Sequence, residues 1–197
     1  GLAIGSVLAV VVFLNLERKS KEDKVLDAIS YFIYSESGEF DNYKALDFVQ
    51  ITNDMLLQDT QLSEQLNVVE DTLNQKVTLL DYHGKLPKAW HRKITSFNTL
   101  QPDQVDDWMK LTAKIDLALS PLNEQKRLAP ILKKEEQALD LIEAKLTALN
   151  LSVYDIDLSG KKTIHYVHRF ALDEEEILSV FEIDTQTDEV ISYKQIG

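Results

Sequence analysis

The side chains best suited to chemistry in this sequence are its four histidines, and their spacing does not assemble a site. His165 and His168 are three positions apart in a segment expected to be a strand, where such neighbours point to opposite faces and cannot share a metal. His83 and His91 lie on either side of a turn. Ordinary surface histidines are the preferred interpretation of that pair, and a shared metal site is the alternative.

Carboxylates are abundant, but none stands in a recognisable catalytic pattern. The run Asp173-Glu174-Glu175-Glu176 lacks the ligand spacing and the glycine of an EF-hand, so a solvated turn is its simplest interpretation. Phosphate-loop, dinucleotide, nucleophile-elbow and HExxH motifs are absent, and so is cysteine, which excludes disulfides, thiolate-held metals and a thiol nucleophile. The sequence predicts a non-catalytic protein without metal or cofactor; an enzyme with a dispersed carboxylate site is the alternative.

Composition limits the partners of the chain. Its 197 residues carry a formal net charge of -12 and are 44% hydrophobic, enough for a sizeable core. A nucleic-acid surface requires clustered Lys and Arg to displace counterions, so we expect no nucleic-acid binding.

An uncharged run at residues 1–16 dominates the organisation of the sequence, and a charged segment follows it directly. The apolar residues of a helix formed by this run would point in every direction, which suits lipid better than a one-sided core. We therefore expect a membrane anchor, in which the candidate lipid-facing residues are Leu2, Ile4, Val7, Leu8, Val10, Val11, Val12, Phe13 and Leu14. A signal-peptide core and a buried helix are the alternatives.

Helical periodicity governs the middle of the chain. Apolar residues recur at helical spacing over 22–36, with Gly38 as a left-handed cap, and a second helix is expected from Asp41 or Asn42 to Leu56. From Thr60 to Tyr82 the apolar residues follow intervals of three and four, close to the pattern of a coiled coil. A helix packed within a bundle is the preferred interpretation, and a coiled coil is the alternative. Further helices are expected over 87–97, after Pro102, and from Leu122 to Leu149.

After Asn150 the apolar residues alternate at a period of two. Strands are expected over 153–158, 164–170, 177–184 and 190–196, with turns at Ser159-Gly160-Lys161 and at 184–188. A helix from Glu135 to Leu149 followed by this antiparallel meander indicates a small α+β end to the chain.

Two stretches are candidate partner-binding sites. Lys88, Arg92 and Lys93 form a basic patch around Trp90, which suits lipid headgroups or an acidic partner, although a solvated helix face is the alternative. Leu178, Val180 and Phe181 lie in an apolar strand near the C-terminus. If that strand were an open edge, a partner could add a strand to it.

The C-terminal quarter resembles a PepSY-type module. The resemblance rests on a helix, a strand containing His165-Tyr166-Val167, the strand Ile177 to Asp184, and the closing segment Asp184-Thr185-x-Thr187-Asp188-Glu189-Val190-Ile191, in which Asp188 replaces the glycine that the family favours. The resemblance implies a non-catalytic module outside the cytoplasmic membrane that modulates peptidases or other envelope proteins.

Together these observations predict an α+β protein with an N-terminal transmembrane helix (1–16), a helical domain (17–130) and a small module (131–197) made of a helix and an antiparallel β-meander. We expect a single-pass bacterial membrane protein whose soluble part lies outside the cytoplasm and binds another envelope or membrane protein. The alternative is a scaffold subunit of an inner-membrane secretion or pilus-type assembly that binds through its helices.

Overall fold

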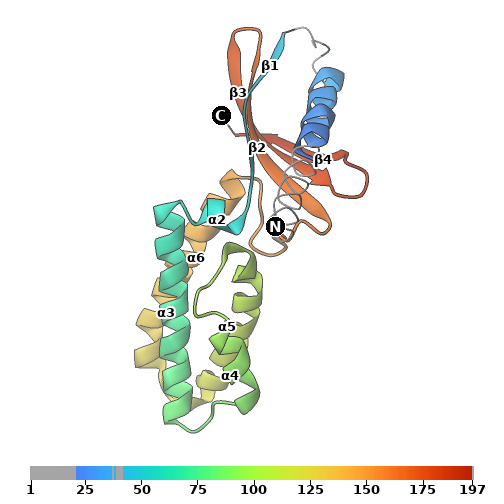
Figure 1. The fold of residues 1–197 in the computed structure, drawn as a ribbon. Helices are drawn as coiled ribbons and strands as arrows, with labels where there is room; N and C mark the ends of the chain where they lie inside the picture. Colours follow the sequence, from blue (N-terminus) through green and yellow to red (C-terminus); the bar gives the residue numbers. More distant parts are fainter. Residues whose placement is uncertain (1–20, 37, 39–41, 197) are drawn as a thin grey trace, which may run out of the picture. The chain divides into compact units, whose positions relative to one another are not determined.

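The computed structural model describes residues 21–36, 38 and 42–196, which fold as an α+β protein (Figure 1). Their packing forms two compact units. One combines the described residues up to Gln50 with those from Ser159 onward, and the other is Ile51–Leu158. These units differ in extent from the segments 17–130 and 131–197 expected from the sequence, because an N-terminal helix and strand pack with the C-terminal strands.

The first unit is a four-stranded antiparallel sheet with one helix on its face. The strands β1 (Tyr43–Gln50), β2 (Thr163–Leu172), β3 (Glu175–Asp184) and β4 (Val190–Gln195) lie in sequential order. The helix over residues 21–36 packs against the sheet, drawn in blue beside it in Figure 1. The buried residues of this core are Val25, Ile29, Ile33, Ile164, Tyr166, Phe170, Phe181 and Ile183.

Three of the four expected strands are confirmed, and the remaining one is wrong. The strand expected over 153–158 is a turn and irregular chain, in which Val153 is buried in the helical unit. The fourth strand is β1, for which the sequence predicted a helix. The run Tyr43–Gln50 pairs with β2 along its length, so ladder hydrogen bonds and cross-strand packing override a pattern that also fits a helix.

The helix over 21–36 ends as the sequence predicted. Gly38 has φ +70°, in the left-handed region that an L side chain adopts only at a cost, and its N–H donates to the Tyr34 carbonyl at 2.8 Å. This bond satisfies one of the carbonyls that the end of a helix leaves without an intrahelical partner.

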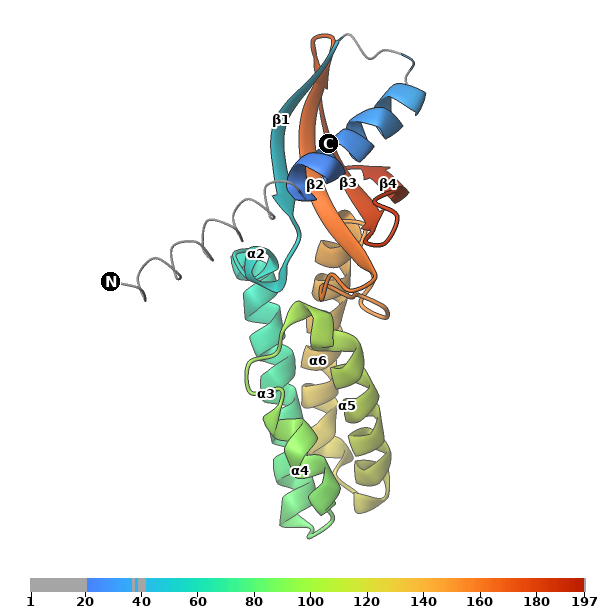
Figure 2. The same ribbon diagram turned by 45° about the vertical axis from the view of Figure 1, so that its right-hand side comes forward.

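The second unit is helical, and three long helices form its body (Figure 2). They are α3 (Thr60–Tyr82), α5 (Val105–Leu119) and α6 (Gln125–Ala148); the short helices are α2 (Asn53–Leu56), α4 (Lys88–Thr95) and the 3-10 turns η1 (Pro102–Gln104) and η2 (Ser120–Leu122). The expected packing of α3 within a bundle is confirmed, because Leu62, Leu66, Val69, Leu73 and Leu80 are at most 2% exposed. Trp108 of α5 is also fully buried.

No helix in the described part of the chain combines the length and apolar character needed to cross a bilayer. The expected transmembrane run, 1–16, lies outside the described residues, so the anchor stays a prediction.

Candidate functional site

The apolar strand that could bind a partner if it were an open edge is an interior strand. β3 pairs with β2 on one side and with β4 on the other, and it therefore cannot receive a partner strand along most of its length. Val180 and Phe181 are fully buried, whereas Leu178 is half-buried. Phe181 belongs to the core between the sheet and the helix, which explains its hydrophobicity.

The basic patch lies on α4, where the helix is exposed. Lys88, Arg92 and Lys93 are exposed side chains, and Trp90 is half-buried. No residue of α4 is fully buried, which leaves this short helix as a peripheral element of the helical unit. The four residues thus lie on one short helix.

A buried histidine in the sheet unit has a defined protonation state. Its Nδ1 lies 2.7 Å from the backbone carbonyl of Asp47, which can only accept, so Nδ1 carries the hydrogen. Burial lowers the pKa of His168, opposed by that hydrogen bond, and keeps the ring neutral. The Tyr43 hydroxyl, 2.7 Å from Nε2, therefore donates to it, and burial raises the pKa of Tyr43.

This arrangement does not provide a nucleophile and its base. Ser179 lies directly across from His168 in the sheet and is also fully buried, but its hydroxyl has no hydrogen-bond partner among the described residues. Both ring nitrogens of His168 are already occupied, and the ring stacks on Phe170 with centroids 5.1 Å apart. A serine that no base contacts and no solvent reaches is not set up for acyl transfer. The geometry indicates a structural role.

The second polar cluster joins the three long helices. The Lys76 ammonium of α3, fully buried, donates to Thr112 of α5 at 3.0 Å and to Glu135 of α6 at 2.5 Å. It also lies 2.8 Å from Oδ1 of Asp116 and 3.0 Å from Oδ2. The Thr112 hydroxyl in turn donates to the second carboxylate oxygen of Glu135 at 2.9 Å, which completes the network. These contacts connect the three helices and fix how they are positioned along one another.

This cluster was not predicted from the sequence, although the sequence contains a signal for it. Lys76 interrupts the apolar stripe of α3 between Leu73 and Leu80, and Glu135 interrupts that of α6. A lysine on one buried stripe and a carboxylate on another indicate a buried pair, because an unpaired buried charge is too costly.

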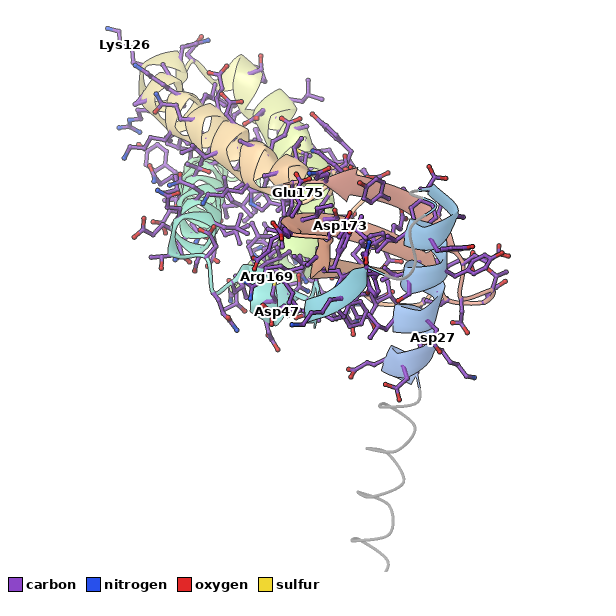
Figure 3. The ribbon with its side chains drawn as sticks, turned by 90° about the horizontal axis from the view of Figure 1, so that it is seen from above. Asp27, Asp47, Lys126, Arg169, Asp173 and Glu175 are labelled. Carbon is purple, nitrogen blue, oxygen red and sulfur yellow. The ribbon has the colours of Figure 1, made fainter. Side chains whose placement is uncertain are left out.

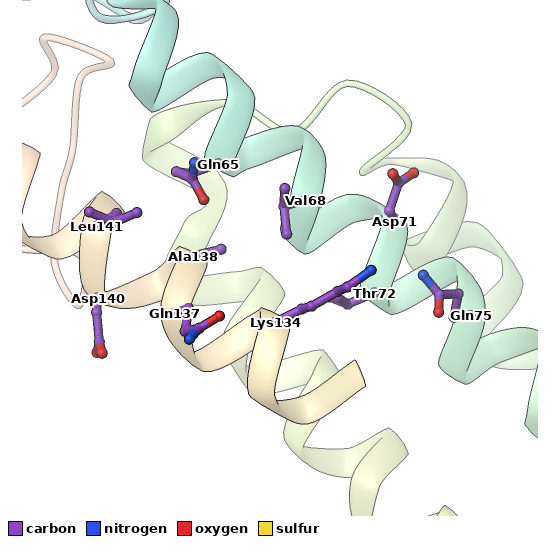
Figure 4. Close-up of a pocket in the computed structure, with 10 residues that line it drawn as sticks. All are labelled: Gln65, Val68, Asp71, Thr72, Gln75, Lys134, Gln137, Ala138, Asp140 and Leu141. Carbon is purple, nitrogen blue, oxygen red and sulfur yellow. The ribbon is translucent and has the colours of Figure 1, made fainter. Parts of the chain in front are cut away.

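A groove runs along the outer side of α3 and α6, as the close-up in Figure 4 shows. It holds a cavity of about 620 Å³ with the small, buried Thr72 and Ala138 on its floor. Its walls carry Gln65, Val68, Asp71 and Gln75 from α3, and Lys134, Gln137, Asp140 and Leu141 from α6. Leu141 is 52% exposed and offers an apolar contact at one end of the groove.

The groove continues beyond Gln75 and Lys134, which also line a second cavity of about 500 Å³. That part is bounded by Thr78 and Leu79 of α3 and by Pro130 and Ile131 of α6. We call the two cavities together the α3–α6 groove. From Gln65 to Leu79 it extends over about 21 Å of helix, long enough to hold a helical segment of several turns.

The sheet surface opposite the helix carries a row of charges rather than a cavity. Arg169 of β2 forms ion pairs with Asp47 of β1 at 2.5 Å and with Glu176 of β3 at 3.8 Å, and Figure 3 shows Arg169 and Asp47 close together. All three side chains are substantially exposed, so these pairs contribute little to stability.

Among the described residues, no group of three or more His, Cys, Asp or Glu side chains is placed to hold an ion. Comparisons of the chain with protein families, with characterised proteins and with solved structures find no match.

Proposed function

We propose that this chain is a membrane-tethered, non-catalytic interaction protein of a bacterial cell envelope, and that its helical unit holds a helix of another envelope protein in the α3–α6 groove. The observation that carries the proposal is the groove itself. It is long and open, and it combines apolar contacts at Val68 and Leu141 with amide side chains that can bind a partner's polar groups.

Two further observations support binding over catalysis. The buried ionisable groups of both units are engaged in structural contacts: His168 with Tyr43 and Asp47, and Lys76 with Glu135 and Asp116. By contrast, Asp71, Lys134 and Asp140 at the groove form no salt bridge with another described residue. Their charges are available to a partner.

A role for the sheet unit is the second candidate, in line with the PepSY-like resemblance. Its edges are β1 and β4, and Ile191 and Tyr193 of β4 are 52% and 43% exposed. A partner strand could add to β4 there. The tether, in both versions, is the uncharged run 1–16, with the remainder outside the cytoplasm.

Hydrogen exchange of the full chain, purified with its cross-linked partner from membranes, separates these two modes. Binding in the α3–α6 groove should slow exchange over Leu62–Leu80 and leave Ile177–Ile196 unchanged; addition of a strand should do the reverse. Protection of neither segment contradicts both modes.

Photo-crosslinking in membranes supplies the matched control. A photoreactive residue at Gln75 or Gln137 should capture the partner, and one at Lys114, exposed on α5 away from the groove, should not. Equal capture from all three positions would mean that the groove is not the binding site.

A further inference from the structure

The exposed face of α6 carries a stripe of charges whose order is unusual. Along it, Lys126, Ala129, Lys133, Glu136, Asp140 and Glu143 recur at alternating intervals of three and four residues, and all are exposed. Residues at these intervals share one face of a helix. We call this set the α6 stripe. Its first half is basic and its second half is acidic.

The stability of α6 itself does not explain this order. The first turn of a helix favours acidic side chains, because the helix dipole places positive potential there. The first turn of α6 instead contains Lys126 and Arg127 and no acidic residue. None of the five charged side chains of the stripe forms a salt bridge with another residue that the structure describes. Lys126 extends outward from the end of α6 in Figure 3.

A sequence that is basic in one half and acidic in the other is complementary to itself when two copies run antiparallel. Centred between Lys134 and Glu135, such a pair places Lys126 opposite the partner's Glu143 and Lys133 opposite the partner's Glu136. The same relation holds in both directions, as a two-fold axis requires. Ala129 lies opposite the partner's Asp140, where a small side chain leaves room for close approach.

A cavity beside the acidic half adds apolar surface to this contact. It has a volume of about 390 Å³ and is lined by Glu136, Asp140 and Glu143 of the stripe together with Leu132, Leu139 and Met109. Leu132 is 40% exposed. Long lysine side chains can lay their methylene groups on apolar surface while the ammonium reaches a carboxylate, so the cavity suits the partner's Lys126 and Lys133.

We propose that the α6 stripe is a self-association surface on which two copies of this chain pair as an antiparallel, two-fold symmetric dimer. The stripe and the α3–α6 groove are neighbouring faces of α6 that share Asp140, whose counterpart in the dimer is the uncharged Ala129. The dimer therefore rests on the pairs of Lys126 with Glu143 and of Lys133 with Glu136, which do not line the groove, and not on the function proposed above.

Charge reversal tests the pairing. One variant carries Lys126→Glu and Lys133→Glu, and the other carries Glu136→Lys and Glu143→Lys. Each variant alone places like charges opposite each other, so its dimerisation constant should weaken by about tenfold or more. An equimolar mixture should associate at least as well as the unmodified chain, because every pair is then attractive. The measurement is sedimentation equilibrium of the full chain in detergent, at low and high salt.

Two results would overturn the proposal: an unmodified chain that stays monomeric at every accessible concentration, or charge-reversed variants that each dimerise alone as well as the unmodified chain does.

Because the chain has no cysteine, single cysteines give a second test that does not depend on altered charge. Lys126→Cys mixed with Glu143→Cys should form a disulfide-linked dimer. Lys126→Cys alone should not form one, because position 126 of one copy and position 126 of the other are about 25 Å apart along the helix in this register. Efficient linkage of Lys126→Cys to itself, or of a Lys114→Cys control on α5, contradicts the antiparallel register.

Discussion

Lys76 and Glu135 face each other across the interior of the helical unit, with 2.5 Å between Nζ and Oε2 and with both side chains buried. They belong to α3 and α6, so one ion pair fixes how the two longest helices meet. Thr112 bonds to both members of the pair and brings α5 into the same register.

Removal of the lysine should leave two carboxylates without their shared cation. For Lys76→Met we expect a loss of about 3–5 kcal/mol in the free energy of unfolding, because Glu135 would remain a buried and uncompensated charge. The double variant Lys76→Met/Glu135→Leu should recover most of that loss. Urea unfolding followed by circular dichroism measures both, with Lys133→Met as an exposed control. A single variant as stable as the unmodified chain contradicts this account.

Stability should depend on pH through His168. Burial lowers the pKa of His168 in the folded chain, so between that value and about 6.5 the unfolded chain binds a proton that the folded chain does not. The contribution of His168 to the free energy of unfolding is therefore fully present above about pH 6.5. It decreases as the pH falls below that value, by at most about 1.4 kcal/mol per pH unit for one proton.

The comparison that isolates this effect is urea unfolding at several pH values for the unmodified chain, for His168→Phe and for His91→Gln. The Tyr43 hydroxyl and the Asp47 carbonyl contact the two ring nitrogens, Ser30 hydrogen-bonds to Tyr43, and none of these groups takes up a proton in this range. We expect a shallower pH dependence for His168→Phe only. An unchanged slope in that variant would show that the ring is not the titrating group.

Phe181 and Leu178 should respond differently to truncation. Phe181 is fully buried and contacts the rings of Phe32 and Tyr193, at centroid distances of 6.2 and 5.3 Å. Phe181→Ala should cost about 3–5 kcal/mol through the cavity that it leaves. Leu178→Ala, at a half-buried position, should cost less than about 2 kcal/mol. Thermal unfolding distinguishes them, and equal losses would contradict the assignment of Phe181 to the core.

The exposed ion pair between β1 and β2 should be nearly neutral in stability. Asp47→Ala removes the carboxylate that pairs with Arg169, yet both side chains are about half exposed or more. We expect a change below about 1 kcal/mol, reduced further at high salt. The backbone carbonyl that His168 uses is retained in this variant. A large loss would mean that the row of charges on this sheet surface contributes to the fold.

Local patterns were sufficient to predict several elements of the structure. The spacing of Leu62, Leu66, Val69 and Leu73 predicts α3, since a helix with that spacing has only one apolar face to bury. The alternation from Ile164 to Phe170 predicts β2 for the corresponding reason. Gly38 predicts a helix end, because few other residues adopt its backbone conformation cheaply.

Long-range pairing decided the rest. Tyr43–Gln50 becomes a strand because β2, more than a hundred residues later in the chain, offers it a ladder, and no local pattern contains that information. The interior position of β3 and the meeting of Lys76 with Glu135 have the same origin. By itself the sequence determined which faces of the long helices are apolar and where the helix over 21–36 and α3 end. Only the tertiary structure decided which faces meet, because burial and pairing energies depend on neighbours that are distant along the chain.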